Sequence, residues 1–261
     1  MRLATLSSGS SGNAVYIGTE RRNILVDAGI SFKRIKEGLE TLGLVPEDLD
    51  AIFITHEHSD HISGLGVLLR KCHLPVYLTE GTYDYIKRCR SLGALPEDCF
   101  RIIKPGAQIT CADLNVCAIA SSHDAAEPVI YRFDCKERSA AVVTDLGCYD
   151  DKIIAALDGL DAMVLEANHD VRMLEVGPYT YELKTRILSS DGHLSNELAG
   201  QLLARIYSPR LKHVLLGHIS EHNNYPQLAL EAVGVEAAFA GIPRDILDIA
   251  PRNKISEIYE L

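Results

Sequence analysis

The sequence predicts an α+β protein in which two similar β-rich halves pack sheet against sheet, with helices on the outside. Two internal echoes support this fold class. Residues 49–54 (LDAIFI) and 160–165 (LDAMVL) share one pattern, and residues 23–29 and 141–147 each run from an apolar stretch into an Asp-x-Gly turn. We therefore expect one domain over residues 1–261, with halves of about 1–125 and 126–261.

Short runs of β-branched and other apolar residues predict the strands. In chain order they lie at residues 14–17, 23–26, 51–55, 76–78, 114–119, 129–133, 139–144, 162–165 and 213–216. Amphipathic segments predict helices, which lie at residues 62–71, 82–91, 152–156, 194–207 and 226–240. In the fourth helix an apolar stripe predicts the face that packs on a sheet, and it consists of Leu198, Leu202, Leu203 and Ile206.

Composition and charge exclude several classes of protein. The chain is 47% hydrophobic and 24% charged, as in ordinary globular domains. Its apolar runs are far shorter than the roughly 20 residues that span a bilayer, and its first residues lack the apolar segment of a signal peptide. We expect a cytoplasmic protein with no membrane partner. Because a net charge of −10 gives no overall attraction for a polyanion, such a substrate would have to be held locally.

The strongest chemical signal is residues 55–61 (THEHSDH), which follow a predicted strand. By composition alone this histidine and aspartate pattern would arise in roughly one such chain in a thousand. Side chains of an extended segment alternate in direction, so His56 and His58 project to the same side and suit one metal ion. Asp60 and His61 fall where the chain turns toward a helix, and they suit a second metal ion nearby.

Three further residues at the ends of predicted strands complete this site. His123 is the expected third ligand of the first metal, Asp145 could bridge both metals, and His218 completes the second site. Each of them alone fits an ordinary loop residue, but together with residues 55–61 they predict two bound metal ions. Zn²⁺ suits the histidine-rich set, and Mn²⁺ is compatible with the same ligands.

The order of these residues resembles that of the metallo-β-lactamase family of binuclear hydrolases. The family signature is Thr-His-x-His-x-Asp-His with a later His, Asp and His, and the resemblance covers nearly the whole chain. It implies an α+β four-layer αβ/βα sandwich with the metals at the edges of the sheets. It also implies that Asp27, after the first strands, orients the site without being a ligand.

Four flanking segments give a narrower resemblance, namely residues 7–13 (SSGSSGN), 166–170 (EANHD), 192–197 (GHLSNE) and 217–224 (GHISEHNN). They look like the YycJ (WalJ, VicX) branch of the family. This resemblance implies a nuclease, with a 5′-to-3′ exonuclease activity on double-strand DNA.

The flanking segments also suggest residues that contact the substrate. Small residues in 7–13 let backbone N–H groups approach a phosphate, although a plain turn is the alternative. The expected substrate-binding residues there are Ser8, Ser10, Ser11 and Asn13. Beyond that loop, His169 and His222 contact substrate or are solvated.

His193 is expected at the start of the helix 194–207, where it could donate a proton to a phosphate oxygen. In the similar tRNA 3′-processing nucleases a Glu and a His assist proton transfer. This implies that Glu166 and His193 form an acid/base pair, and the alternative is a pair that caps the helix.

The expected reaction is attack on a phosphodiester by a hydroxide between the two metals, with Asp60, Glu166 and His193 as catalytic residues. DNA is expected as the substrate rather than RNA. The alternatives within this chemistry are an RNase Z-like endoribonuclease and a small cyclic phosphodiesterase. Alternatives of another class are a glyoxalase II-like thioesterase and a di-iron oxidoreductase, and the latter is disfavoured because its relatives place a carboxylate where His58 stands.

Overall fold

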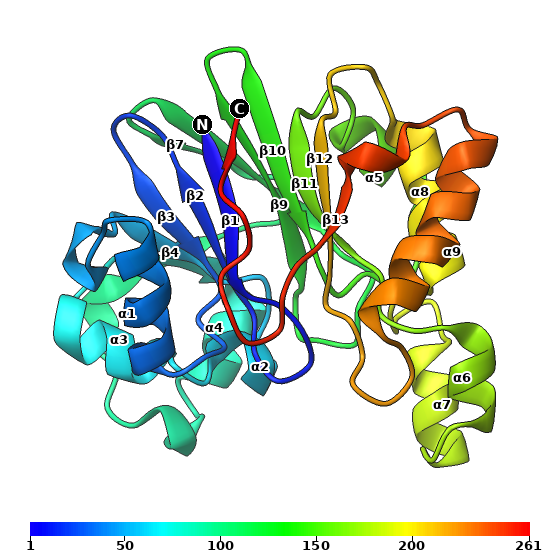
Figure 1. Cartoon of the computed structure of the whole chain (residues 1–261). Helices are drawn as coiled ribbons and strands as arrows, with labels where there is room; N and C mark the ends of the chain where they lie inside the picture. The colour runs from blue at the N-terminus through cyan, green and yellow to red at the C-terminus, as the bar shows by residue number, and fades with distance from the viewer.

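The computed structural model describes residues 1–261 and places two seven-stranded sheets face to face between layers of helices (Figure 1). The first sheet contains β1 (Arg2–Ser7), β2 (Ala14–Gly18), β3 (Asn23–Val26), β4 (Ala51–Phe53), β5 (Val76–Thr79), β6 (Phe100–Ile103) and β14 (Tyr259–Glu260). The second contains β7 (Gln108–Cys111), β8 (Leu114–Ala120), β9 (Val129–Cys135), β10 (Arg138–Val143), β11 (Ala162–Glu166), β12 (His213–Gly217) and β13 (Leu247–Ile249). The predicted four-layer sandwich is confirmed.

Both sheets follow one plan. The strand orders are β14-β1-β2-β3-β4-β5-β6 and β13-β12-β11-β10-β9-β8-β7. Strands β3 to β6 run parallel, as do β10 to β13, and the remaining strands pair antiparallel. The two sequence echoes therefore fall on equivalent parallel pairs, β3 with β4 and β10 with β11.

The chain changes sheet between Ile103 and Gln108, earlier than the expected midpoint near residue 125. Strands β7 and β8 thus belong to the second sheet, and the last strand, β14, returns to the first. The two termini lie side by side at the edge of the first sheet formed by β14 and β1. There the N–H of Leu261 donates to the carbonyl of Met1.

Helices cover the outer face of each sheet (Figure 1). The first sheet is covered by α1 (Phe32–Thr41), α2 (Ser59–Ile62), α3 (Leu65–Cys72) and α4 (Glu80–Ile86), and the second by α5 (Asp151–Ala156), α8 (Asn196–Ile206) and α9 (Pro226–Phe239). A pair of short helices, α6 (Val171–Val176) and α7 (Tyr181–Ile187), extends beyond the end of the second sheet. None of the helices combines the length and the apolar composition that a membrane span requires.

Apolar side chains fill the space between the sheets and the space under each helical layer. Ile24 and Val26 of β3 face the other sheet, whereas Leu25 between them packs beneath the helices. Parallel strands that are covered on both faces carry continuous apolar runs, as this strand does from Ile24 to Val26. The core thus holds the parallel strands rigidly, up to the points where their polar carboxyl ends begin.

The apolar stripe predicted for the fourth helix is partly wrong. Leu202, Leu203 and Ile206 are buried on α8, but Leu198 is 39% exposed. Ala199 and Gly200 are buried instead, and a Cβ on Gly200 would lie 2.5 Å from a Glu236 side-chain atom of α9. The close approach of α9 therefore sets the buried face of α8.

Candidate metal centre and active site

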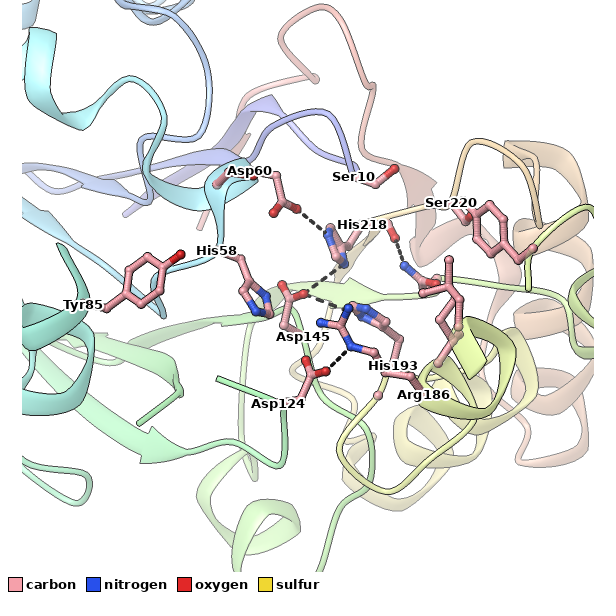
Figure 2. Close-up of a pocket in the computed structure, with 16 residues that line it drawn as sticks. Ser10, His58, Asp60, Tyr85, Asp124, Asp145, Arg186, His193, His218 and Ser220 are labelled. Atoms are coloured by element: carbon pink, nitrogen blue, oxygen red, sulfur yellow. Dashed lines mark hydrogen bonds and ion pairs between the residues drawn. The ribbon is translucent and has the colours of Figure 1, made fainter. Parts of the chain in front are cut away.

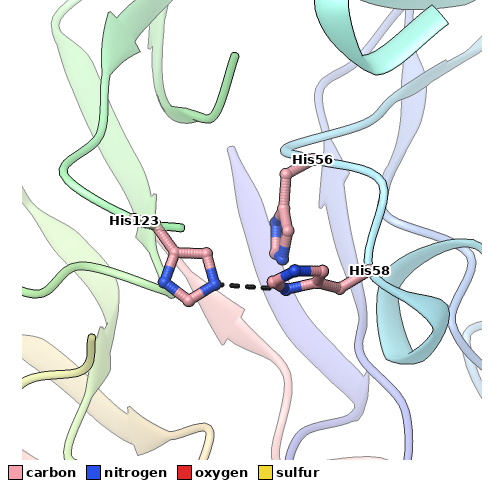
Figure 3. Close-up of side chains that lie close together, drawn as sticks. All are labelled: His56, His58 and His123. Carbon is pink, nitrogen blue, oxygen red and sulfur yellow. Dashed lines mark hydrogen bonds between the residues drawn. The ribbon is translucent and has the colours of Figure 1, made fainter. Parts of the chain in front are cut away.

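The predicted site residues meet at one edge of the molecule, where the parallel strands of both sheets end. Residues 55–61 follow β4, and Asp145 and His218 follow β10 and β12. His123 comes from the connection between β8 and β9. Because carboxyl ends of parallel strands share an edge, each sheet delivers its polar residues to the same place. The structure brings all seven predicted ligands together (Figures 2 and 3).

Three histidines form the first cluster, and Figure 3 shows their rings converging. The candidate ligand atoms of His56, His58 and His123 lie within 4.8 Å of one another. Nδ1 of His123 lies 2.9 Å from the carbonyl of Gly192, so it carries the proton and leaves a lone pair on Nε2. This Nε2 faces Nδ1 of His58 at 3.2 Å. A bound cation satisfies such facing nitrogens.

The second cluster consists of Asp60, His61 and His218, again with candidate ligand atoms within 4.8 Å. Nε2 of His218 lies 3.2 Å from Oδ2 of Asp60 (Figure 2). Asp145 lies between the two clusters, with Oδ2 at 3.0 Å from Nε2 of His61 and Oδ1 at 3.6 Å from Nε2 of His123. A carboxylate that bridges two metals needs this position.

Polar groups outside the clusters contact Nδ1 of His56 and of His61, the ring nitrogens that point away from the metal clusters. Asp27 places Oδ2 at 2.7 Å from Nδ1 of His61 and accepts a hydrogen bond from the N–H of Thr55 at 2.8 Å. The Thr55 hydroxyl lies 3.0 Å from Nδ1 of His56. Such contacts fix the tautomer and direct the free nitrogen into the cluster.

Glu166 holds two histidines at once. Its Oε1 lies 2.8 Å from Nδ1 of His193 and 2.7 Å from Nδ1 of His218. Its Oε2 accepts the N–H groups of Leu146 at 3.0 Å and Leu194 at 3.1 Å. With four donors and no solvent exposure, the Glu166 carboxylate is linked to the cavity only through the two imidazoles.

The backbone is strained where these side chains are presented. Asp27, Asp145 and His218 adopt the left-handed region with φ of 60°, 57° and 50°. Non-glycine residues seldom adopt it, and they gather at functional sites when they do. The turns after Asp27 and Asp145 need glycine because other backbone segments approach them closely. A Cβ at Gly29 would lie 1.6 Å from the carbonyl oxygen of Asp60, and one at Gly147 would lie 2.3 Å from that of Ser190.

The electric field of the site favours cations. Burial lowers the pKa of His56 well below its ordinary value, which keeps the imidazole in the neutral form that binds metal. Burial would raise the pKa of Asp145, but His218, His61 and His56 hold it well below its usual range. Burial would likewise lower the pKa of His61, yet Asp145, Asp27 and Asp60 raise it well above the ordinary value.

These residues fit two metal ions. Nε2 of His56 is buried without a hydrogen-bond partner, and Oδ2 of Asp145 is buried with no hydrogen bond beside its ion-pair contact with His61. Leaving such atoms unsatisfied is costly unless another group binds them. The clusters combine imidazole nitrogens with the carboxylates of Asp60 and Asp145, a donor set that suits divalent transition metals. Buried clusters of this kind are typical of a binuclear metal site.

A cavity of about 420 Å³ opens above the clusters (Figure 2). Its lining includes residues of the metal clusters, His193, and several residues that the sequence analysis did not predict as site residues. Among them are Tyr85 on α4, Asp124 beside His123, and Arg186 on α7. Figure 2 shows Tyr85 beyond His58 and Arg186 on the opposite side.

The structure separates the expected substrate-binding residues into two groups. Ser8 and Asn13 are buried and support the site, since Oγ of Ser8 accepts the N–H of His218 at 2.9 Å and Nδ2 of Asn13 lies 3.1 Å from Nε2 of His61. Ser10 and Ser11 are exposed, and Ser10 lines the cavity. The loop thus has both supporting and open positions.

The two remaining histidines differ sharply. His169 is buried with neither ring nitrogen hydrogen-bonded, and burial lowers its pKa to about 4. His222 is exposed and its ring lies 5.8 Å from that of Tyr179, a cavity residue. Neither His169 nor His222 lines the cavity itself.

The helix expected to start beside His193 begins later. It starts at Asn196, and Ser195 caps it by accepting the N–H of Leu198. His193 therefore precedes the helix, and its side chain is positioned by Glu166 and not by the helix end. The side chain lines the cavity and is 20% exposed.

Known proteins of similar sequence and structure agree with this picture of a metal-dependent hydrolase fold. The family described as Beta-lactamase superfamily domain matches residues 22–219. Exodeoxyribonuclease WalJ of Streptococcus pneumoniae is 42% identical over 228 residues, which cover 87% of this chain and 85% of that protein. Exodeoxyribonuclease YycJ of Bacillus anthracis is 41% identical over 233 residues, covering 89% and 88%. The structure of Zn²⁺-bound PqqB from Methylobacterium extorquens shares the fold, with a TM-score of 0.73 at 17% identity over 98% of this chain and 100% of that one.

Proposed function

This chain belongs to the metallo-β-lactamase superfamily, and we propose that it is a metal-dependent exodeoxyribonuclease. The observation that carries the proposal is the pair of buried clusters linked by Asp145 at the floor of an open cavity. Relatives that share 42% and 41% identity over most of the chain are named exodeoxyribonucleases, which supports DNA as the substrate. The expected action is 5′-to-3′ on double-strand DNA.

Two ions, Zn²⁺ or Mn²⁺, would be held by residues from both sheets. His56, His58 and His123 would hold the first ion, Asp60, His61 and His218 would hold the second, and Asp145 would be shared. When bound, the two ions supply a water of lowered pKa and neutralise the phosphoryl oxygens. Because neither sheet alone provides a complete site, residues 1–261 act as one unit.

The chain itself supplies the proton for the leaving oxygen. Burial would lower the pKa of His193, but the Glu166 carboxylate outweighs it and raises the pKa. This favours the protonated form of His193, with Nδ1 held by Glu166 and Nε2 left for the cavity. It can donate this proton to the ester oxygen as the bond breaks. Glu166 is the positioning residue of this pair.

The proposed function is tested by digesting duplex DNA labelled at the 5′ or the 3′ end, using metal-stripped protein with Zn²⁺ or Mn²⁺ added back. The expected result is early release of the 5′ label as a mononucleotide and gradual shortening of the 3′-labelled strand. RNA of the same sequence, a cyclic dinucleotide and a glutathione thioester serve as rival substrates. Rapid thioester cleavage with DNA and RNA intact under both metals would overturn the nuclease assignment.

A further inference from the structure

The active-site cavity is strongly acidic, with one exception. Its sixteen lining residues include the carboxylates of Asp60, Asp124 and Asp145, and Arg186 is the only lysine or arginine among them. Several basic residues outside the cavity are paired with carboxylates of their own surroundings, for example Arg22 with Asp50 at 2.7 Å. A polyanionic substrate in a chain of net charge −10 therefore meets one guanidinium at the cavity.

The guanidinium of Arg186 donates only one of its possible hydrogen bonds to the protein. Its Nε donates to Oδ2 of Asp124, and its Nη1 and Nη2 make no hydrogen bond. The side chain is 55% exposed, and Figure 2 shows it beside Asp124 and His193. Two parallel donors in a fixed fork match two oxygens of one phosphate. The free end of Arg186 is thus a phosphate-binding group that lacks its ligand.

Asp124 links this fork to the metal centre. Oδ1 of Asp124 lies 3.6 Å from Nε2 of His123, so one carboxylate separates the guanidinium from a candidate ligand atom. The N–H of Asp124 donates to the carbonyl of Asp191 at 2.9 Å, and the Ser122 hydroxyl donates to that of Ser190 at 2.8 Å. These bonds join the His123 loop to the segment after α7. The two oxygens of Asp124 thus face opposite ways, one toward the His123 ligand atom and one toward Arg186, so the guanidinium lies on the far side of this carboxylate from the metal centre.

We propose that Arg186, oriented by Asp124, binds the phosphate next to the scissile one in a nucleic-acid strand. This inference rests on the proposed nuclease function and makes it more specific. A substrate with at least two phosphates occupies both the metal centre and the fork, whereas an isolated phosphodiester occupies only the first. The pair therefore selects strands over single esters and Asp124 is its positioning residue.

The test compares Arg186→Ala, Arg186→Lys and the matched control Arg205→Ala. Arg205 is 57% exposed and pairs with Asp151 at 3.2 Å, much like Arg186, but it lies outside the cavity. For Arg186→Ala we expect KM for an oligodeoxynucleotide to rise roughly tenfold or more, because a charge-assisted contact is lost. The loss in kcat/KM on bis(4-nitrophenyl) phosphate should be at least about tenfold smaller than the loss on DNA, and metal content should stay at the wild-type value.

Salt dependence gives a second readout that a structural role would not change. The slope of log kcat/KM against log salt should become shallower by about 0.7 to 0.9 in Arg186→Ala, as for one lost phosphate contact. Arg186→Lys should restore that slope but not the KM, because a point charge replaces the fork. Arg205→Ala should match the wild type in both measurements.

Three results would overturn the proposal. The first is an unchanged KM and salt slope in Arg186→Ala while the wild type digests DNA. The second is an equal loss on DNA and on the single ester, which would place Arg186 at the reacting phosphate. The third is a wild-type protein that hydrolyses the single ester but no nucleic acid, which would remove the proposed function and this inference with it.

Discussion

Replacing Asp60 with alanine is expected to slow DNA hydrolysis by roughly a thousandfold or more, because it removes both a ligand of the second ion and the charge it provides. Oδ2 of Asp60 lies 3.2 Å from Nε2 of His218 and 3.4 Å from Nε2 of His61. Burial would raise the pKa of Asp60, but His61 and His218 hold it well below its usual range, so the carboxylate is ionised. The kinetics should be measured together with metal content.

The fold should survive this change, because Asp60 lies at the sheet edge with its side chain 22% exposed and contributes nothing to the apolar core. Circular dichroism and thermal unfolding check this directly. Asp98→Ala is a matched control, since Asp98 also pairs with a histidine, His73, at 2.9 Å but on an exposed surface away from the cavity. Full activity in Asp60→Ala would contradict the two-metal account.

Replacing His193 with alanine is expected to slow cleavage by roughly a hundredfold or more, because the proton donor for the leaving oxygen is lost. Wild-type activity should fall as pH rises through the raised pKa of His193, since only the protonated imidazole can donate. The variant should lack this alkaline limb of the pH profile. The measurement is kcat as a function of pH on end-labelled DNA.

Metal content decides what kind of residue His193 is. Asp145, Glu166, His193 and His218 form a further group whose candidate ligand atoms lie within 4.8 Å, so a role as a ligand has to be tested. We expect His193→Ala to keep its metal, and His73→Ala, an exposed histidine outside the cavity, to keep both metal and activity. A parallel loss of metal and activity in His193→Ala would make His193 a ligand.

The sequence predicted best those features that local pattern controls. The alternation of side chains after β4 predicted that His56 and His58 point the same way, and their ring centroids lie 4.6 Å apart. The paired echoes predicted two similar halves, because strand, turn and acid recur together at Asp27 and Asp145. Strand ends are recognisable because apolar runs stop there and polar side chains follow.

Features that depend on distant contacts were missed. The strands β13 and β14 have three and two residues and exist only through pairing with β12 and β1. Helix α1 has an apolar face of Phe32, Ile35 and Leu39, but its lysines and arginines hide that signal. The helix α7 is equally polar, so Arg186 could not be placed at the site from the sequence.

The left-handed backbone of Asp27, Asp145 and His218 is only weakly indicated by the sequence, since Asp and His adopt it more often than most residues but still seldom. None of the three is glycine, and their conformation is held by contacts such as those of Asp27 with Thr55 and of His218 with Glu166. The chemistry of the ligands was therefore visible in the sequence, whereas the strain that presents them is a property of the folded molecule.

The central claim is that this chain holds two metal ions between its two sheets. Elemental analysis of the purified protein tests it most directly, by counting the metal ions bound per chain. We expect two ions of Zn²⁺ or Mn²⁺ per chain, held at His56, His58 and His123 and at Asp60, His61 and His218. No more than trace transition metal, in protein that digests DNA at its full rate, would contradict it.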